Sequence, residues 1–373
     1  MKTPRTVTYR GEHLLAMKEQ GTVPAGVLAA LMAEADALLK LPPVSVVRRR
    51  QHPQNGNLHA YTSRGPYWWP DPNTPDGLPY IRRDGEINPE SQETENYEVM
   101  ATRANTLALA AFYSGDLRYA QKAVEALTCW HLDEDTYMEP HARYAQAIPG
   151  HCEGRGIGLI DFCQAHLAFD AVGILEAMDA ISPETVQRLK EWYSAFVNFM
   201  LTDEQGLTED VHHNNHGTFF DVTALAIALF TGREALANKI VKLAYDRRHR
   251  AHVRADGAQP HELERTRAIG YSLCNLKGLS LLASWADRLG DARYLSPDPD
   301  AGVVLVQAAY DYILPHAKDP EASPLLEIHP EGVTANLARM AHQMHAFFGE
   351  SRYLEDAAPF LSDTMLWRAA PLI

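Results

Sequence analysis

Apolar residues recur at intervals of three and four along most of the chain after residue 96. This spacing places them on one face of a helix. It predicts helices over 98–113, 158–178, 185–201, 218–230, 234–246, 266–289, 302–314 and 333–348. Alternation of apolar and polar residues, which is typical of strands, is scarce in the same region. We therefore expect an all-α protein.

Short polar breaks that contain glycine or proline separate the expected helices. These breaks are Ser114-Gly115-Asp116, Ser182-Pro183-Glu184, Thr231-Gly232-Arg233, Leu289-Gly290-Asp291 and Gly349-Glu350-Ser351. The first and the last are similar, since an aromatic pair precedes each and a tyrosine follows. Repeated helical hairpins of this kind favour an α/α solenoid whose inner helices line a cleft.

Residues 42–95 follow a different pattern. They contain prolines at 42, 43, 53, 66, 70, 72, 75, 79 and 89 and show no helical period. A long ordered loop inside a compact domain usually has a function. No linker-like stretch divides the chain, so we expect residues 1–373 to form a single domain.

The composition narrows the classes of partner. Hydrophobic residues make up 46% and charged residues 22% of the chain, and the formal net charge is −14. This charge argues against nucleic acid, because phosphate binding requires a face rich in lysine and arginine. An acidic substrate would require a local positive cleft. We expect Arg64, Arg82, Arg83, Arg155, Arg265 and Arg267 to line it.

The sequence predicts neither export nor membrane binding. The residues after Met1 form no apolar segment of a secretory signal, and no run approaches about 18 apolar residues. The expected location is the cytoplasm, or the periplasm or exterior if a signal has been removed. The four cysteines lack the spacing of a disulfide scaffold or metal site. No cofactor or metal is predicted, and no pattern indicates an oligomeric state.

A run of polar residues precedes the apolar helix predicted at 218–230. It comprises His212, His213, Asn214, Asn215 and His216. Free N–H groups and a partial positive charge at a helix start suit an anion such as a sugar carboxylate. The alternative is a polar cap with solvated histidines. His212 and His216 have a spacing that suits a metal, but no glutamate follows His212 as in a zinc protease helix.

Two further segments carry candidate substrate contacts. Tyr67, Trp68 and Trp69 lie between proline breaks, where aromatic rings would stack on sugars beside a carboxylate-binding Arg64, or would fold back as an apolar plug. Arg155 lies in a glycine-rich loop that lacks the lysine and the strand of a phosphate-binding loop. Arg155 is either a substrate contact or a solvated loop residue.

Three blocks of sequence resemble the alginate lyase family, most closely polysaccharide lyase family 38 and more distantly family 5. The blocks are Asn215-His216 followed by aromatic residues, Gly65-Pro66-Tyr67-Trp68-Trp69-Pro70-Asp71-Pro72 with its continuation to Gly85, and Glu262-Leu263-Glu264-Arg265-Thr266-Arg267-Ala268-Ile269-Gly270-Tyr271. They keep the family's order within residues 60–275. The resemblance implies an incomplete α/α toroid that cleaves uronic-acid polysaccharides by β-elimination.

This reaction removes the weakly acidic C5 proton of a uronate and expels the oxygen at C4. The enzyme has to neutralise the adjacent carboxylate and supply a base and an acid. The resemblance implies that Tyr271 is the acid–base residue. It also implies that Asn215, His216 and an arginine neutralise the substrate carboxylate. On a helix Arg267 would lie on nearly the same face as Tyr271, but the resemblance ranks Arg265 first. Gln259 and Glu262 would contact sugar, or form a capped helix start.

One tyrosine suffices where the C5 proton and the C4 oxygen lie on the same side of the ring. This favours polymannuronate or glucuronan over polyguluronate. Two other functions remain open. An inverting glycoside hydrolase would use two carboxylates roughly 6.5–9.5 Å apart, from among Asp210, Asp221, Glu262 and Glu264. A non-catalytic uronate-binding protein would keep the aromatic loop without needing Tyr271.

Overall fold

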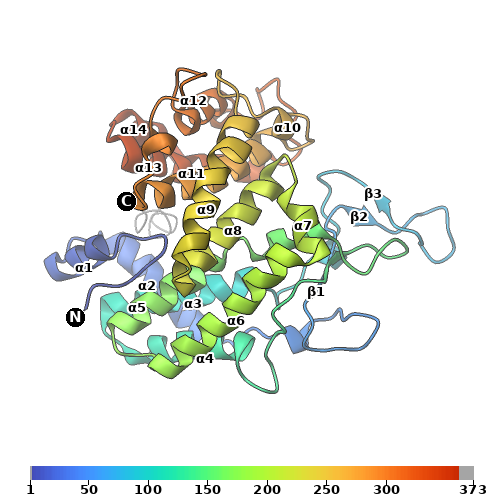
Figure 1. The fold of residues 1–373 in the computed structure, drawn as a ribbon, viewed down its shortest axis with the longest axis horizontal. Helices are drawn as coiled ribbons and strands as arrows, with labels where there is room; N and C mark the ends of the chain where they lie inside the picture. Colours follow the sequence, from blue (N-terminus) through green and yellow to red (C-terminus); the bar gives the residue numbers. More distant parts are fainter. Residues whose placement is uncertain (1, 361–373) are drawn as a thin grey trace. The chain divides into compact units, whose positions relative to one another are not determined.

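The computed structural model describes residues 2–360 (Figure 1). These residues group into two compact units that alternate along the chain. The first unit comprises residues 2–6, Met32–Val211 and Ala226–Gly232. The second comprises Val7–Leu31, His212–Leu225 and the described residues from Arg233 to Phe360. Neither unit is one continuous stretch of sequence.

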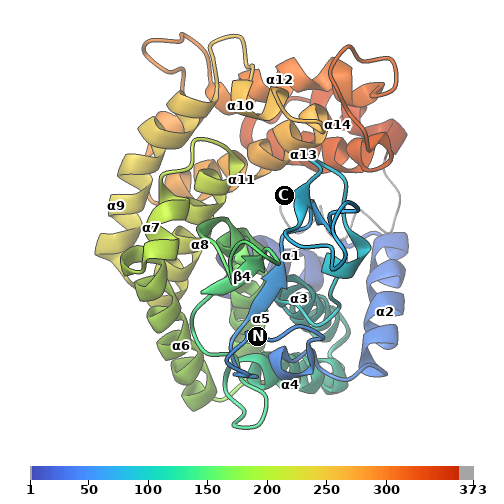
Figure 2. The same ribbon diagram turned by 90° about the vertical axis from the view of Figure 1, so that its right-hand side faces the viewer.

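The first unit is built on helices that follow the irregular segment. Helix α3 (Tyr97–Ser114) packs against α4 (Leu117–His131) and α5 (Ala165–Ala177), and α4 also contacts α6 (Pro183–Thr202), which leads into α7 (Glu204–Asp210) (Figure 2). Aromatic rings fill the space between these helices. The Phe162 ring lies 4.8 Å from Tyr97 and 4.7 Å from Phe196 between centroids.

The helix predicted over 158–178 is divided in two. A 3-10 helix, η3 (Gly156–Phe162), precedes α5. A Cβ atom at Gly158 would lie 2.5 Å from the Cβ of Ala145, so η3 packs directly on the preceding strand. The span Gly156–Ala177 has the length and hydropathy of a membrane helix, but 67% of it is buried. Among the described residues this is the one unbent span of that kind. Its burial is that of a core helix.

Residues 42–95 are irregular, as predicted, and contain only short elements. They are η1 (Val46–Arg48), β1 (Thr62–Arg64), β2 (Trp68–Trp69), β3 (Ile81–Arg82) and η2 (Pro89–Ser91). Strand β1 pairs in parallel with β4 (Tyr144–Ala147), and β2 pairs antiparallel with β3. The aromatic segment therefore lies on a small hairpin.

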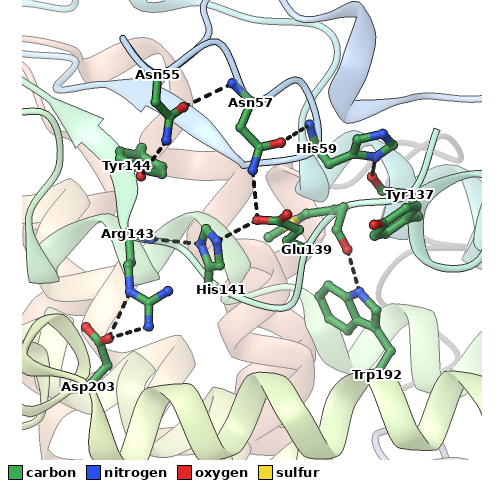
Figure 3. Close-up of polar contacts among 11 residues, drawn as sticks. Asn55, Asn57, His59, Tyr137, Glu139, His141, Arg143, Tyr144, Trp192 and Asp203 are labelled. Atoms are coloured by element: carbon green, nitrogen blue, oxygen red, sulfur yellow. Dashed lines mark hydrogen bonds and ion pairs between the residues drawn. The ribbon is translucent and has the colours of Figure 1, made fainter. Parts of the chain in front are cut away.

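A polar network beside β4 joins two loops of the first unit (Figure 3). The side chain of Asn57 donates from Nδ2 to Oε2 of Glu139 at 3.0 Å, and Nε2 of His141 lies 2.9 Å from the same oxygen. Asn55 donates to the hydroxyl of Tyr144 at 3.1 Å. Since Tyr144 begins β4, the network fixes this strand to the 55–59 loop.

The second unit begins with α1 (Gly11–Gln20) and the first turns of α2 (Ala25–Leu39). Later come the start of α8 (Asn215–Thr231), then α9 (Glu234–Ala244), a π-helical segment η4 (Tyr245–Arg250), α10 (Pro260–Leu263), α11 (Ala268–Arg288), η5 (Ala292–Leu295), α12 (Leu305–Lys318), η6 (Pro330–Gly332), α13 (Val333–Phe348), α14 (Arg352–Ala357) and η7 (Ala358–Phe360). Helices α11, α12 and α13 pack on one another.

The predicted helix breaks are confirmed. Gly115, Gly232, Gly290 and Gly349 have φ angles of 77°, 73°, 85° and 68°, in the left-handed region that glycine tolerates at a helix end. Ser182 accepts from the Thr185 N–H at 3.0 Å and caps α6. Helices α1 and α2 were not predicted, because alanine and long polar side chains obscure the periodicity of their apolar residues.

Helices α8 and α11 approach each other closely within the second unit. A Cβ atom at Gly278 would lie 2.7 Å from Cγ2 of Thr218 and 3.5 Å from the Phe219 ring. Thr218 is one turn beyond Asn215, and Gly278 is two turns beyond Tyr271. The contact therefore places the starts of both helices in one region.

Candidate active site

The start of α8 is a capped turn. Asn214 accepts from the His216 N–H at 3.2 Å through Oδ1 and from the Thr218 N–H at 3.3 Å through its carbonyl oxygen. Asn215, the first residue of the helix, is 1% exposed. It donates to Glu262 twice, from its main-chain N at 2.6 Å and from Nδ2 at 2.8 Å. His216 is half-buried.

Arg248 fixes the turn that precedes the helix. Its Nη1 donates to the carbonyl oxygen of His212 at 3.0 Å. A Cβ atom at Gly217 would lie 2.1 Å from that carbonyl oxygen and 2.5 Å from Nη1. A glycine is needed at 217 because the turn and the guanidinium fill the space beside it.

The same guanidinium belongs to a buried ion cluster. Asp221 is fully buried and accepts from Nε of Arg247 at 3.0 Å and from Nε of Arg248 at 2.7 Å. Burial raises the pKa of the Asp221 carboxyl, while the two arginines oppose that shift. Consecutive residues of an α-helix point about 100° apart. The wider π-helical turn at 245–250 lets both arginines reach one carboxylate.

Tyr271 lies in the first turn of α11, and both candidate arginines precede the helix. The Arg267 carbonyl oxygen accepts from the Tyr271 N–H at 2.8 Å, so the expected one-turn spacing holds for Arg267. Arg265 lies in the break between α10, which ends at Leu263, and α11, which begins at Ala268. The Arg265 guanidinium lies 4.1 Å from the Tyr271 ring centroid, and that of Arg267 lies 6.0 Å away. The geometry supports Arg265 as the partner of Tyr271.

Arg267 faces a different group. Its Nε lies 3.9 Å from Oε1 of Glu327, whose side chain is 1% exposed. Glu327 also accepts from the Gly270 N–H at 2.8 Å and the His329 N–H at 3.0 Å. This carboxylate caps the start of α11. Sequence analysis missed Glu327 because it comes from a segment about sixty residues away.

The structure places Gln259 and Glu262 in the interior and not among sugar contacts. Gln259 is 2% exposed, donates to the Ser272 carbonyl oxygen at 3.0 Å and accepts from Asn275 at 2.8 Å. Glu262 is 1% exposed and both of its oxygens accept from Asn215. Both oxygens of Glu262 and the amide oxygen of Gln259 accept from protein groups, which corrects the expectation that these acceptors bind sugar hydroxyls.

The histidines of this region form two ring contacts. The rings of His212 and His216 lie 5.7 Å apart, and those of His213 and His261 lie 4.3 Å apart. His252, which the sequence analysis passed over, is 3% exposed and its Nδ1 lies 3.0 Å from Oγ1 of Thr218. Burial and then Arg248 lower the pKa of His252 to about 3, so this imidazole is neutral.

The aromatic segment lies in the first unit and is half-buried. The Trp68 ring lies 5.2 Å from the His151 ring and 5.9 Å from the Arg155 guanidinium. Trp69 donates from Nε1 to the Glu86 carbonyl oxygen at 3.0 Å, and Arg83 lies 5.2 Å from its ring. Trp68 thus packs on the loop around residue 151, and Trp69 packs on its own hairpin. Tyr67 is also half-buried.

Arg155 donates two hydrogen bonds to Gln146, which was not among the predicted site residues. Its Nε donates to the Gln146 carbonyl oxygen and its Nη2 to Oε1 of Gln146, both at 3.0 Å. Gln146 has a φ of 50°, in the left-handed region that a side chain disfavours. Its Nε2 donates to Asp161 at 3.3 Å. No sequence signal marks this conformation, because it arises from contacts across the unit.

Several arginines of the predicted positive cleft are paired with carboxylates within their own unit. The pairs are Arg64–Glu90 at 3.6 Å, Arg82–Asp84 at 2.6 Å, Arg83–Glu86 at 3.7 Å and Arg267–Glu327 at 3.9 Å. A hollow of about 540 Å³ in the first unit is lined by Arg50, Arg64, His52 and His151, with Glu153 also on its wall.

Two of the carboxylates considered for hydrolysis are already bound by protein groups. Asp221 is bound by two arginines and Glu262 by Asn215, both in the interior. Glu264 is exposed. Buried carboxylates whose oxygens are occupied cannot protonate a leaving group or activate a water.

Comparison with known proteins gives the family of this chain. The family model described as alginate lyase matches residues 45–323. The chain belongs to the alginate lyase family. A solved alginate lyase from Bacteroides ovatus is 35% identical, with a TM-score of 0.91 over 98% of this chain and 99% of that one. Among curated proteins no match was found.

More distant structures share the fold alone. Alginate lyase A1-III from Sphingomonas species A1 is 15% identical, with a TM-score of 0.62 over 98% of this chain and 96% of that one. A tyrosine-to-phenylalanine variant of that enzyme in complex with a tetrasaccharide gives the same score and identity. The fold class is the α/α toroid of these lyases, as the sequence predicts. This family member is a polysaccharide lyase.

Proposed function

We propose that the protein cleaves a 1,4-linked polyuronate, polymannuronate or glucuronan, by β-elimination, with Tyr271 as base and then acid. The observation that carries this proposal is the Arg265 guanidinium, 4.1 Å from the centroid of the Tyr271 ring. A cation over the ring face stabilises the electron-rich phenolate more than the phenol. Tyr271 would then accept the C5 proton.

The start of α8 supplies the groups for the substrate carboxylate. His216 is half-buried, and Asn215 lies beside it with its carboxamide set by Glu262. Together with Arg265, these side chains would stabilise the enolate-like charge that develops next to C5. The tetrasaccharide bound to the Sphingomonas enzyme supports an oligomeric acidic sugar as ligand here.

One residue can carry the proton when the C5 proton and the C4 oxygen lie on the same face of the sugar ring. Tyr271 takes the C5 proton, the C4–C5 double bond forms, and the C4–O bond breaks. The phenol then returns its proton to the departing oxygen. Mannuronate and glucuronate have this same-side arrangement, and guluronate does not.

A panel of defined polyuronates tests the proposal. Purified protein should release unsaturated products from polymannuronate or glucuronan, seen as near-ultraviolet absorbance, and should act far more slowly on polyguluronate. Preferred cleavage of polyguluronate would overturn the one-tyrosine mechanism. Reducing ends that appear without absorbance would indicate hydrolysis.

A further inference from the structure

One buried carboxylate joins the main chain and the side chain of the same asparagine. Oε1 of Glu262 accepts from the main-chain N of Asn215 at 2.6 Å, and Oε2 accepts from Nδ2 at 2.8 Å. The two bonds close a ring that includes the Asn215 Cα–Cβ bond. The ring fixes both side-chain torsions of Asn215, and the second N–H of the amide is not used by it.

The charge of Glu262 determines which end of the carboxamide faces it. A carboxylate only accepts hydrogen bonds, so it selects the NH2 end of Asn215 and repels the amide oxygen. A neutral side chain of the same shape would not make this selection. The orientation of Asn215 therefore depends on the acceptor character of Glu262 and not on packing alone.

Glu262 also connects the two helix starts of the site. It lies on α10, which Gln259 ties to α11 through Ser272 and Asn275. It also satisfies the first N–H of α8, which has no partner within the helix. Arg265 and His216 interact with it electrostatically. Glu262 thus interacts with every group that is assigned to bind the substrate carboxylate.

A buried negative charge beside a site for an anionic sugar lowers the affinity of that site. Burial raises the pKa of Glu262, and the two Asn215 donors oppose that shift. A glutamine would fill the same volume without the charge. A glutamate is therefore explained at this position because Asn215 requires two acceptors, one for its main-chain N–H and one for Nδ2.

We propose that Glu262 is a positioning residue that orients the Asn215 carboxamide toward the carboxylate of the reacting sugar. The proposal rests on the proposed elimination, in which Asn215 stabilises the developing charge. Glu262 itself does not touch the substrate. Its effect on turnover passes through Asn215.

A double-mutant cycle tests this dependence on Asn215. Glu262→Gln should lower kcat for release of unsaturated product about 10- to 100-fold, because the glutamine NH2 cannot accept from Nδ2. Asn215→Ala should lower it by roughly 10²–10³, as loss of one oxyanion donor does. The double variant should match Asn215→Ala within about threefold, because coupled residues are not additive. Multiplicative losses, or a Glu262→Gln enzyme with wild-type kcat, would overturn the proposal.

The chain offers a matched control in its first unit. Glu139 accepts from Nδ2 of Asn57 at 3.0 Å, the same pairing of carboxylate and carboxamide (Figure 3). Glu139→Gln should leave kcat unchanged. A comparable loss in Glu139→Gln would show that removing such a carboxylate acts through the fold, which contradicts the proposal. The melting temperature of each variant separates misfolding from lost turnover.

The cycle is measured only on a polymer from which the wild-type enzyme releases unsaturated product. If no polyuronate gives such product, the proposed function fails before Glu262 is tested. If product forms and the losses multiply, only the role of Glu262 fails.

Discussion

The two groups of predicted substrate residues are held in different ways. Asn215 and Tyr271 lie in the first turns of long helices, and buried carboxylates from other segments bind the starts of both helices. Trp68 and Trp69 lie on a two-residue strand and are half-buried. Reacting groups must be placed within a fraction of an ångström, while sugar-stacking rings tolerate movement. Changes in the first group should therefore alter kcat, and changes in the second should alter KM.

The largest effect is expected from Tyr271→Phe. The substitution removes one hydroxyl and leaves the ring under Arg265, so turnover should fall by at least about 10³-fold while polyuronate still binds. Stopped assays of unsaturated product and calorimetric titration of an oligouronate measure the two quantities. Near wild-type turnover would remove Tyr271 from the chemistry.

The two arginines near Tyr271 allow a finer test. Arg265→Lys should lower kcat roughly tenfold, because lysine cannot stack a planar guanidinium on the ring. Arg267→Lys should have little effect on kcat and a small effect on melting temperature, since Arg267 faces Glu327. Steady-state kinetics of the two variants under identical conditions decide between them. A larger kcat loss in Arg267→Lys would reverse the assignment.

Smaller effects are expected in the aromatic loop. Trp68→Ala and Trp69→Ala should each raise KM about 2- to 10-fold, the range for one aromatic contact, and leave kcat within about twofold. Initial rates across substrate concentration provide both values. A tryptophan whose removal lowers kcat would belong with the helix-borne group, and the contrast between the two regions would no longer hold.

Acid should destabilise the fold through the buried histidines of the second unit. Burial lowers the pKa of His249 and of His252 to about 3. Unfolded histidines titrate near about 6.5, so between these values the unfolded chain binds protons that the folded chain does not. The contribution of these two histidines to the free energy of unfolding should be constant above pH of about 7 and should decrease as the pH falls toward about 4.

Melting temperatures across this pH range measure the effect. His249→Gln keeps a donor for the Leu279 carbonyl oxygen, which lies 3.1 Å from His249 Nε2, and removes the titration. Its melting temperature should fall less steeply with acid than that of the wild type. Parallel curves for the two proteins would show that His249 does not contribute.

Local chemistry made the helices predictable and indicated the candidate site residues. Glycines 115, 232, 290 and 349 marked helix ends because their left-handed backbone disfavours other residues. The polar run before α8 and the order of the sequence blocks indicated Asn215, His216 and Tyr271. Each signal lies within about ten residues of the chain.

The partners of those residues were not predictable from the same signals. Glu327 caps α11 from a distant segment, and Glu262, predicted to touch sugar, binds Asn215 instead. Whether a glutamate faces solvent, substrate or a helix start depends on tertiary packing, which periodicity does not encode. The same limit explains why the contact of Arg265 with the Tyr271 ring was not predicted from helix spacing, since Arg265 lies in the break between α10 and α11.

The π-helical segment at Tyr245–Arg250 has a consequence for variation in length. A π turn is an α-helix with one residue inserted, and here the insertion directs Arg247 and Arg248 to the same side. Deleting one residue would restore a regular helix and turn one guanidinium away from Asp221. Sequences that align here with a one-residue gap should therefore lack one of the two arginines, or lack the aspartate.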